Sequence, residues 1–213
     1  HPTWDDTPWG GEGFKFPLRR RFYYQLHRSV PRLFPSPRPT VRLAEGEHIS
    51  LANREWVAIH TPGHTEDHLC LFDAEAGVML CGDHVLPNIT PHISGMTAAV
   101  DPLAGFFASL DKVAAFGSGV RISLPAHGNP FANLAGRCDA IKDHHLLRLE
   151  KLRQISTEFA KPATVTEFSG HLFSARAQGP MADSETYAHL EHLRLKGEFD
   201  YHTDKGVRQY LHT

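Results

Sequence analysis

Residues 56–84, WVAIHTPGHTEDHLCLFDAEAGVMLCGDH, hold the pattern from which the rest of the chain can be interpreted. Three short apolar runs lie inside this stretch, at 56–59, 68–72 and 78–81, and the acidic, glycine-ending segment 73–77 joins the last two. Apolar runs of this length between turn-forming residues are typical of buried β-strands. The stretch therefore predicts three neighbouring strands.

Polar side chains follow the strands at the points where they end. His64 comes after a Pro-Gly break behind the first run, and Asp83 closes the third. His127 follows a further strand-like segment at 121–124. A lone loop histidine is usually a surface polar group, but imidazoles and a carboxylate held at neighbouring strand ends suit a divalent metal such as zinc. Together these residues predict a metal site at one edge of the sheet.

The composition is that of an ordinary globular protein, with 41% hydrophobic and 22% charged residues among 213 and a formal net charge of -2. This balance gives no reason to expect a general polyanion binder. No apolar run approaches the roughly 18–20 residues of a membrane helix, and no signal peptide is visible, so we expect no membrane partner. The three cysteines show no CxxC spacing; they predict buried free thiols and a cytoplasmic location.

The segment 14–34, FKFPLRRRFYYQLHRSVPRLF, mixes basic residues with aromatic and aliphatic ones and can form a helix between Pro17 and Pro31. One interpretation is a surface helix with a solvated basic face. The other is a basic lip for an anionic substrate, such as a coenzyme A thioester or RNA. The sequence leaves both open.

Strands and helices alternate through the first two thirds of the chain, which favours an α/β layering. The predicted elements are strands at 41–43, 48–51 and 55–59, with a hairpin tip at 53–54, an amphipathic helix at 104–116 and a strand at 121–124.

The composition changes from Cys138 onward, and helical patterns dominate. Helices are predicted at 140–160, 165–173 and 183–196, followed by a hairpin with arms at 199–202 and 207–211. Three helices followed by a hairpin describe a winged helix. We therefore predict two domains, 1–138 and 139–213.

Three motifs in this order, HTPGHTEDH, GDHVLPNITPHIS and PAHG, resemble the later motifs of the metallo-β-lactamase-fold hydrolases. The likeness is closer to glyoxalase II-like and β-lactamase-like members that carry a C-terminal winged helix, and it covers roughly residues 38–213. It implies an α/β fold: the αββα sandwich of that family, of which the chain would hold the C-terminal part, followed by a small winged-helix domain.

The resemblance also implies roles for the strand-end residues. In that family the residue matching His64 binds a first metal, the one matching His127 binds a second, and the one matching Asp83 bridges both and is catalytic. His68 would orient the loop of His64 without touching metal. Two further histidines would line the substrate side, with core or surface positions as the alternative: His84 and His92.

The same resemblance implies a pair of zinc ions, with iron or manganese as alternatives because mixed His/Asp ligands accept all three. Metal-activated hydroxide would then attack an ester, thioester, lactam or phosphodiester. The family's first metal motif, HxHxDH, is absent from the sequence. We expect that the N-terminal half of the domain lies outside this chain, the alternative being a diverged relative.

Three functions remain in play. The first is hydrolysis of a small-molecule thioester or ester, and the second is RNA cleavage by a β-lactamase-like endonuclease. The third is a non-catalytic, metal-poor binding module. Residues 183–208 carry six acidic against four basic side chains, which disfavours nucleic acid as a partner. We therefore predict a small-molecule hydrolase, and leave open whether it forms a homodimer.

Overall fold

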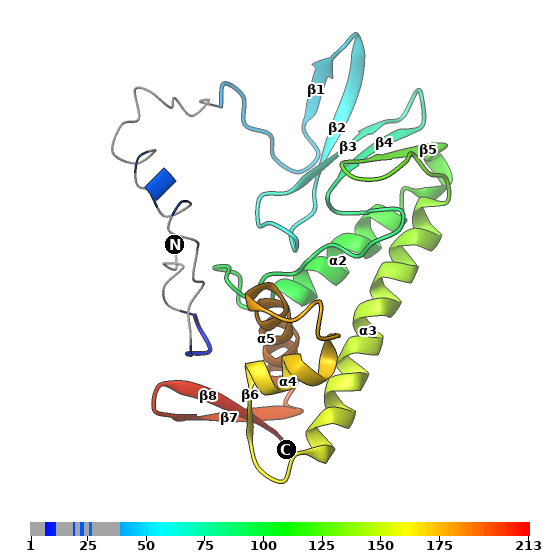
Figure 1. The fold of residues 1–213 in the computed structure, drawn as a ribbon. Coiled ribbons are helices and arrows are strands. Elements are labelled where there is room, and N and C mark those ends of the chain that lie inside the picture. The colour runs from blue at the N-terminus through cyan, green and yellow to red at the C-terminus, as the bar shows by residue number, and fades with distance from the viewer. Residues whose placement is uncertain (1–6, 12–18, 20–21, 24–25, 27–38) are drawn as a thin grey trace.

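The computed structural model describes residues 7–11, 19, 22–23, 26 and 39–213. Within these residues a five-stranded sheet and a smaller three-stranded sheet lie at opposite ends of the molecule, and one long helix runs between them (Figure 1). The predicted basic helix within 14–34 lies largely outside the described residues. Every helix that the structure describes is too short or too polar to cross a bilayer.

The larger sheet is mixed and has the order β1-β2-β3-β4-β5. Its strands are β1 (His48–Leu51), β2 (Arg54–His60), β3 (Leu69–Asp73), β4 (Val78–Gly82) and β5 (Ile122–Pro125). The first four pair antiparallel, whereas β5 pairs parallel to β4. These strands confirm the predictions for the 48–84 region and for 121–124.

The strand predicted at 41–43 does not form. The chain turns immediately after it, where the Glu47 carboxylate accepts a hydrogen bond from the Ala44 amide at 2.7 Å. Val41 is 61% exposed, so the apolar character of this segment is not used for burial. That prediction was wrong because hydrophobicity alone cannot supply the neighbouring strand that a ladder needs.

Helix α2 (Pro102–Ala114) packs against the larger sheet, as the helical spacing of its apolar residues predicts. The Asp101 side chain caps it by accepting from the Ala104 amide at 2.9 Å, and Pro102 occupies the first turn, where no donor is needed. Phe106 lies at the centre of its buried face and is fully buried.

Helix α3 (Leu134–Glu158) is the long helix in Figure 1 that reaches from the end of β5 to the smaller sheet. It starts six residues before the predicted position 140, because the Asn133 side chain accepts from the Gly136 amide at 3.2 Å and caps the earlier turn. Cys138 therefore lies inside a continuous helix. The predicted division of the chain near that residue stays a prediction.

The C-terminal part has α4 (Val165–Leu172), α5 (Pro180–Leu195) and the hairpin of β7 (Phe199–Asp204) and β8 (Val207–His212). The predicted order of helices and hairpin is confirmed. The short strand β6 (Ala163–Thr164) also pairs with β8, giving the sheet order β6-β8-β7. One hydrophobic core runs from the larger sheet through α3 into this part of the chain.

The cysteines are free and buried, as predicted. Burial raises the pKa of the Cys70 thiol to about 12, and it raises the pKa of the Cys138 thiol to about 12 as well. Both therefore stay protonated at neutral pH and pack as small hydrophobic groups.

Candidate metal site

Asp83 and His127 meet at the edge of the larger sheet where β4 and β5 end side by side. Because these strands are parallel, their carboxyl ends point the same way, and the Ala126 amide donates to the Gly82 carbonyl at 2.8 Å. The His127 Nε2 atom lies 3.3 Å from Asp83 Oδ1. Both side chains reach solvent, the carboxylate at 36% and the imidazole at 69% exposure, so this pair is open to a ligand.

His64 lies in the loop that follows β2. Gly63 precedes it with φ +141°, and a Cβ there would be 2.5 Å from Phe106 Cβ, so only glycine lets the loop approach α2 this closely. The His64 Nδ1 atom donates to the His92 carbonyl at 2.8 Å. A carbonyl only accepts, so the neutral ring carries its lone pair on Nε2, the arrangement common among metal-binding histidines.

His68 ties the His64 loop to Asp83. Its Nε2 accepts from the Asp83 amide at 3.2 Å, and its Nδ1 lies 2.7 Å from the Thr61 hydroxyl. Burial, and after it the nearby charge of His64, lower the pKa of His68. A neutral ring that already accepts on Nε2 fits the predicted supporting role, in which His68 binds no metal itself.

His84 and His92 take different positions from each other. His84 is fully buried with its ring edge-on to Phe106, and neither ring nitrogen has a hydrogen-bond partner among the described residues. Burial lowers the pKa of His84 to about 3, so it is neutral. The His92 ring is half-buried and lies 3.3 Å from a Glu185 carboxylate oxygen. The substrate-side role of both remains a prediction.

The predicted ligands are thus partly gathered. Asp83 and His127 are in contact, and both Asp83 and His64 act electrostatically on the ring of His68. Among the described residues, a tighter group with ligand atoms within 4.8 Å of one another lies elsewhere, and it does not include this trio. The assignment of His64, Asp83 and His127 as metal ligands therefore stays a prediction.

The tighter group is His145 of α3 with Glu185 and His189 of α5, and the sequence prediction missed it. His145 Nδ1 lies 3.0 Å from His189 Nε2, and His189 Nδ1 donates to the Glu185 carbonyl at 2.7 Å. A sequence signal existed, because His145 falls on the buried stripe of α3 four residues after Ile141 and four before Leu149.

This buried group has the residue types of a divalent metal site. Its charge is nevertheless already balanced, since Arg148 pairs with one oxygen of Glu185 and His92 contacts the other. A divalent ion would bring two further positive charges into a site where the single carboxylate is neutralised. We therefore interpret His145, Glu185 and His189 as a hydrogen-bonded network first.

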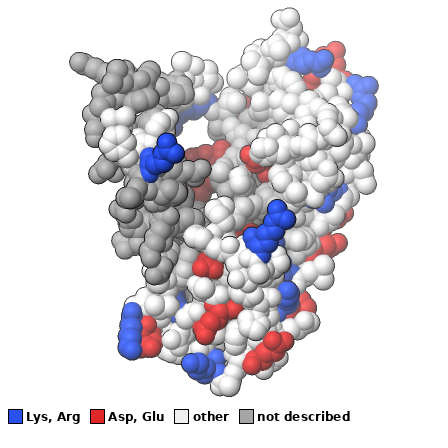
Figure 2. All heavy atoms as spheres, in the orientation of Figure 1, with Lys and Arg blue, Asp and Glu red and all other residues white. Residues whose placement is uncertain are grey.

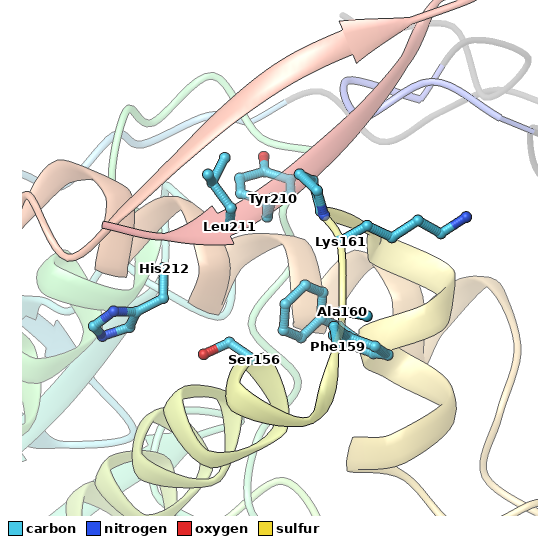
Figure 3. Close-up of a pocket in the computed structure, with 9 residues that line it drawn as sticks. Ser156, Phe159, Ala160, Lys161, Tyr210, Leu211 and His212 are labelled. Atoms are coloured by element: carbon cyan, nitrogen blue, oxygen red, sulfur yellow. The ribbon is translucent and has the colours of Figure 1, made fainter.

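A surface hollow of about 240 Å³ lies near the smaller sheet, far from the strand-end residues. In Figure 3, Ser156 and Phe159 from the end of α3 and its exit lie below Tyr210 and Leu211 of β8. The titratable groups among the residues that line it are Lys161, Tyr210 and His212. Its lining brings no carboxylate together with a histidine, so it does not compete with the strand-end site.

Comparison with known proteins matches residues 1–155 to the family described as the metallo-beta-lactamase superfamily. The probable metallo-hydrolase YqjP of Bacillus subtilis is 30% identical over 148 residues, which are 66% of this chain and 45% of that protein. The atrochrysone carboxyl ACP thioesterase of Aspergillus terreus is 38% identical over 80 residues, 38% of this chain and 22% of that protein. The chain thus spans less than half the length of these curated relatives.

Two solved structures are similar over most of the chain. A metallo-beta-lactamase family protein from Thermus thermophilus has a TM-score of 0.71 and 30% sequence identity. The match covers 91% of this chain and 66% of the Thermus chain. A beta-lactamase domain protein from Burkholderia ambifaria has a TM-score of 0.75 and 28% sequence identity. The match covers 92% of this chain and 60% of the Burkholderia chain.

Proposed function

The chain belongs to the metallo-beta-lactamase superfamily, and from this premise we propose that it is part of a metal-dependent hydrolase acting on a small-molecule thioester or ester. The observation that carries the proposal is the contact of Asp83 with His127, 3.3 Å apart at the open ends of two parallel strands. Membership of this superfamily of hydrolases implies divalent metal binding, and the strand-end residues offer the donors for it.

His64, Asp83 and His127 are the residues that we propose as metal ligands. They fit a divalent ion by their chemistry, since a carboxylate faces one imidazole and a second imidazole keeps the lone pair on its Nε2. Zinc is the metal we propose. These residues would hold a pair of ions, and Asp83 would be the catalytic carboxylate shared by both. The HxHxDH motif that supplies the remaining ligands in such hydrolases is absent from this sequence.

A bound divalent ion would supply Lewis acidity and a water of lowered pKa. The chain's own residues do the positioning. His68 holds the Asp83 backbone through its amide, and the His92 carbonyl holds His64 in one tautomer. The exposure of Asp83 and His127 leaves room for an ester or thioester carbonyl beside them.

A small substrate fits this chain better than RNA. We propose that α3, α4 and α5 with the β7–β8 hairpin form a winged-helix-like module, whose use in nucleic-acid binding would need free basic groups. Arg194 and Arg208 instead pair with the buried Glu191. On the face shown in Figure 2, acidic and basic side chains are interspersed, which does not favour a polyanion.

Metal content tests the proposal. Elemental analysis should find zinc bound to this chain weakly, and bound tightly to a product extended upstream with the native gene. Short acyl thioesters of coenzyme A and p-nitrophenyl acetate then serve as substrates for the extended product. Asp83→Asn should lose more turnover than the roughly 10–100-fold that removal of an outer-shell partner costs.

Asp67→Asn is the matched control, because Asp67 is an exposed aspartate in the same loop as His64. It should keep both metal and turnover. An extended product that holds no metal, or an Asp83→Asn variant as active as the control, would remove the metal-dependent hydrolase and leave only the fold.

A further inference from the structure

The loop 85–100, between β4 and α2, controls one of the proposed metal ligands. The backbone carbonyl of His92, in this loop, accepts a hydrogen bond from His64 Nδ1 at 2.8 Å. The position of this carbonyl therefore decides which His64 nitrogen is protonated and where the other nitrogen points. The residues that hold this loop in place therefore also determine the geometry of the site.

Helix α5 holds this loop through its first turns. Ser184 Oγ lies 3.2 Å from Ser94 Oγ and accepts from the Gly95 amide at 3.1 Å, while the Gly95 amide also donates to the Ser184 carbonyl. Gly95 has no space for a side chain, since a Cβ there would be 2.4 Å from the Tyr187 ring. The loop therefore packs directly against α5, with no space left for a side chain at Gly95.

Glu185 makes the contact next to His64. Its carboxylate accepts from the His92 ring at 3.3 Å, and its other oxygen pairs with Arg148 of α3. Glu185 is 7% exposed. Burial would raise its pKa, but the hydrogen bond from His92 and the charge of Arg148 hold that pKa below its usual value. The ionised carboxylate belongs to α5 and is paired with an arginine of α3, so its position is fixed and it can hold the His92 ring in place.

We propose that Glu185 is a positioning residue for His64, acting through His92. The carboxylate on α5 fixes the His92 ring, the His92 carbonyl fixes the Nδ1–H of His64, and Nε2 is left in a defined direction for the metal. The C-terminal helices would thereby set the geometry of a ligand that lies in the sheet half of the molecule. The metal part of this inference rests on the proposed function, whereas the tautomer part stands on its own.

Two readouts test the inference on the full chain. The first is the tautomer of His64, measured from its ring ¹⁵N shifts in a His-labelled sample without metal. The second is the affinity for Co²⁺ as a spectroscopic substitute for zinc, measured by titration. Neither readout needs a known substrate, and a purely structural role of Glu185 would leave the tautomer unchanged in a folded variant.

Three variants and one control separate the possibilities. His92→Leu removes the ring anchor but keeps the backbone carbonyl and the pair of Glu185 with Arg148. Glu185→Ala removes the anchor and also leaves Arg148 unpaired, so Glu185→Gln accompanies it as the conservative change that keeps an oxygen acceptor. Asp183→Ala is the matched control, because it removes a carboxylate from the same turn of α5 that bonds only Thr166 in the described structure.

We expect His64 to be the Nδ1–H tautomer in the wild type and in Asp183→Ala. In His92→Leu and Glu185→Ala it should become a mixture, and Co²⁺ affinity should fall about 10-fold, with Glu185→Gln closer to wild type. An unchanged tautomer in folded His92→Leu overturns the inference, even if Glu185→Ala fails to fold. If this chain binds no Co²⁺, the metal part of the inference fails for it and the tautomer alone decides about Glu185, whereas the proposed function is decided by the metal content of the upstream-extended product.

Discussion

Gly82 is the residue where backbone conformation and the candidate site meet. It has φ +52°, and a Cβ added there would lie 2.5 Å from the His68 Nε2 atom. That same nitrogen accepts the amide of Asp83. The glycine of the GD pair is therefore needed twice, once for its left-handed backbone and once to admit the imidazole that orients the next residue.

Gly82→Ala should destabilise the protein by about 1–3 kcal/mol, because a side chain is strained at this φ and must displace His68. Urea denaturation followed by circular dichroism measures the change. Gly170→Ala is the control, since Gly170 lies inside α4 with open space at its Cβ position. There alanine should be neutral or stabilising by up to roughly 1 kcal/mol. Equal effects at the two sites would contradict the role given to Gly82.

At the scale of elements, α3 and α5 meet through two buried imidazoles. Burial lowers the pKa of His145 and of His189, and the nearby His189 ring further lowers the pKa of His145. Both stay neutral in the folded protein from about pH 6.5 down towards pH 4, because the pKa of His189 is lowered to about 4. Histidines of the unfolded chain take up protons throughout this range. The unfolded state then binds more protons, so the free energy of unfolding must fall as pH falls.

The expected result is stability that is fully present above about pH 6.5 and is lost below it, by up to about 1.4 kcal/mol per pH unit for each histidine. Denaturation curves between pH 7.5 and 4.5 give the slope. His189→Gln, which cannot titrate, should make the slope shallower whatever it does to stability at pH 7.5. His171→Gln, which makes the same replacement at the exposed end of α4, is the matched control for the substitution itself. A slope unaffected by His189→Gln would show that this pair is not what excludes protons.

The elements themselves could largely be predicted from the sequence, because periodicity and turn residues are local signals. The strands around Asp83 and the helix carrying Phe106 are examples. The start of α3 could not be predicted, because it depends on the left-handed backbone conformation of its N-cap residue Asn133, with φ +58°. Nor could the pairing of His145 with His189, because two histidines 44 positions apart meet only once the helices pack.

At the scale of the whole molecule, the candidate site depends on long-range packing in the same way. Motifs around His64, Asp83 and His127 could be found in the sequence because each follows a strand. The loop that fixes His64 is itself fixed by Glu185, 93 positions after His92. No local pattern marks that contact, so the contribution of the C-terminal helices became visible only in the structure.

This packing predicts that the described part of the chain unfolds as one unit. Trp56 lies in β2 and is 7% exposed, whereas Trp9 is 4% exposed and packs on Tyr187 of α5, with ring centroids 5.0 Å apart. The two indoles therefore report on opposite ends of the molecule. Because α3 contributes core residues to both ends without a break, loss of either end should remove support from the other.

Two variants that each keep one reporter test this. The chain has three tryptophans, so Trp4→Phe is combined with Trp9→Phe to leave Trp56, or with Trp56→Phe to leave Trp9. Each urea midpoint from fluorescence should coincide with the midpoint that circular dichroism gives for the same variant. If the Trp9 and Trp56 reporters each depart from that midpoint, in opposite directions, the chain consists of two units that unfold separately. The division predicted near residue 138 would then mark a real boundary inside α3. The positioning of His64 by Glu185 would in that case be an interaction between the two units.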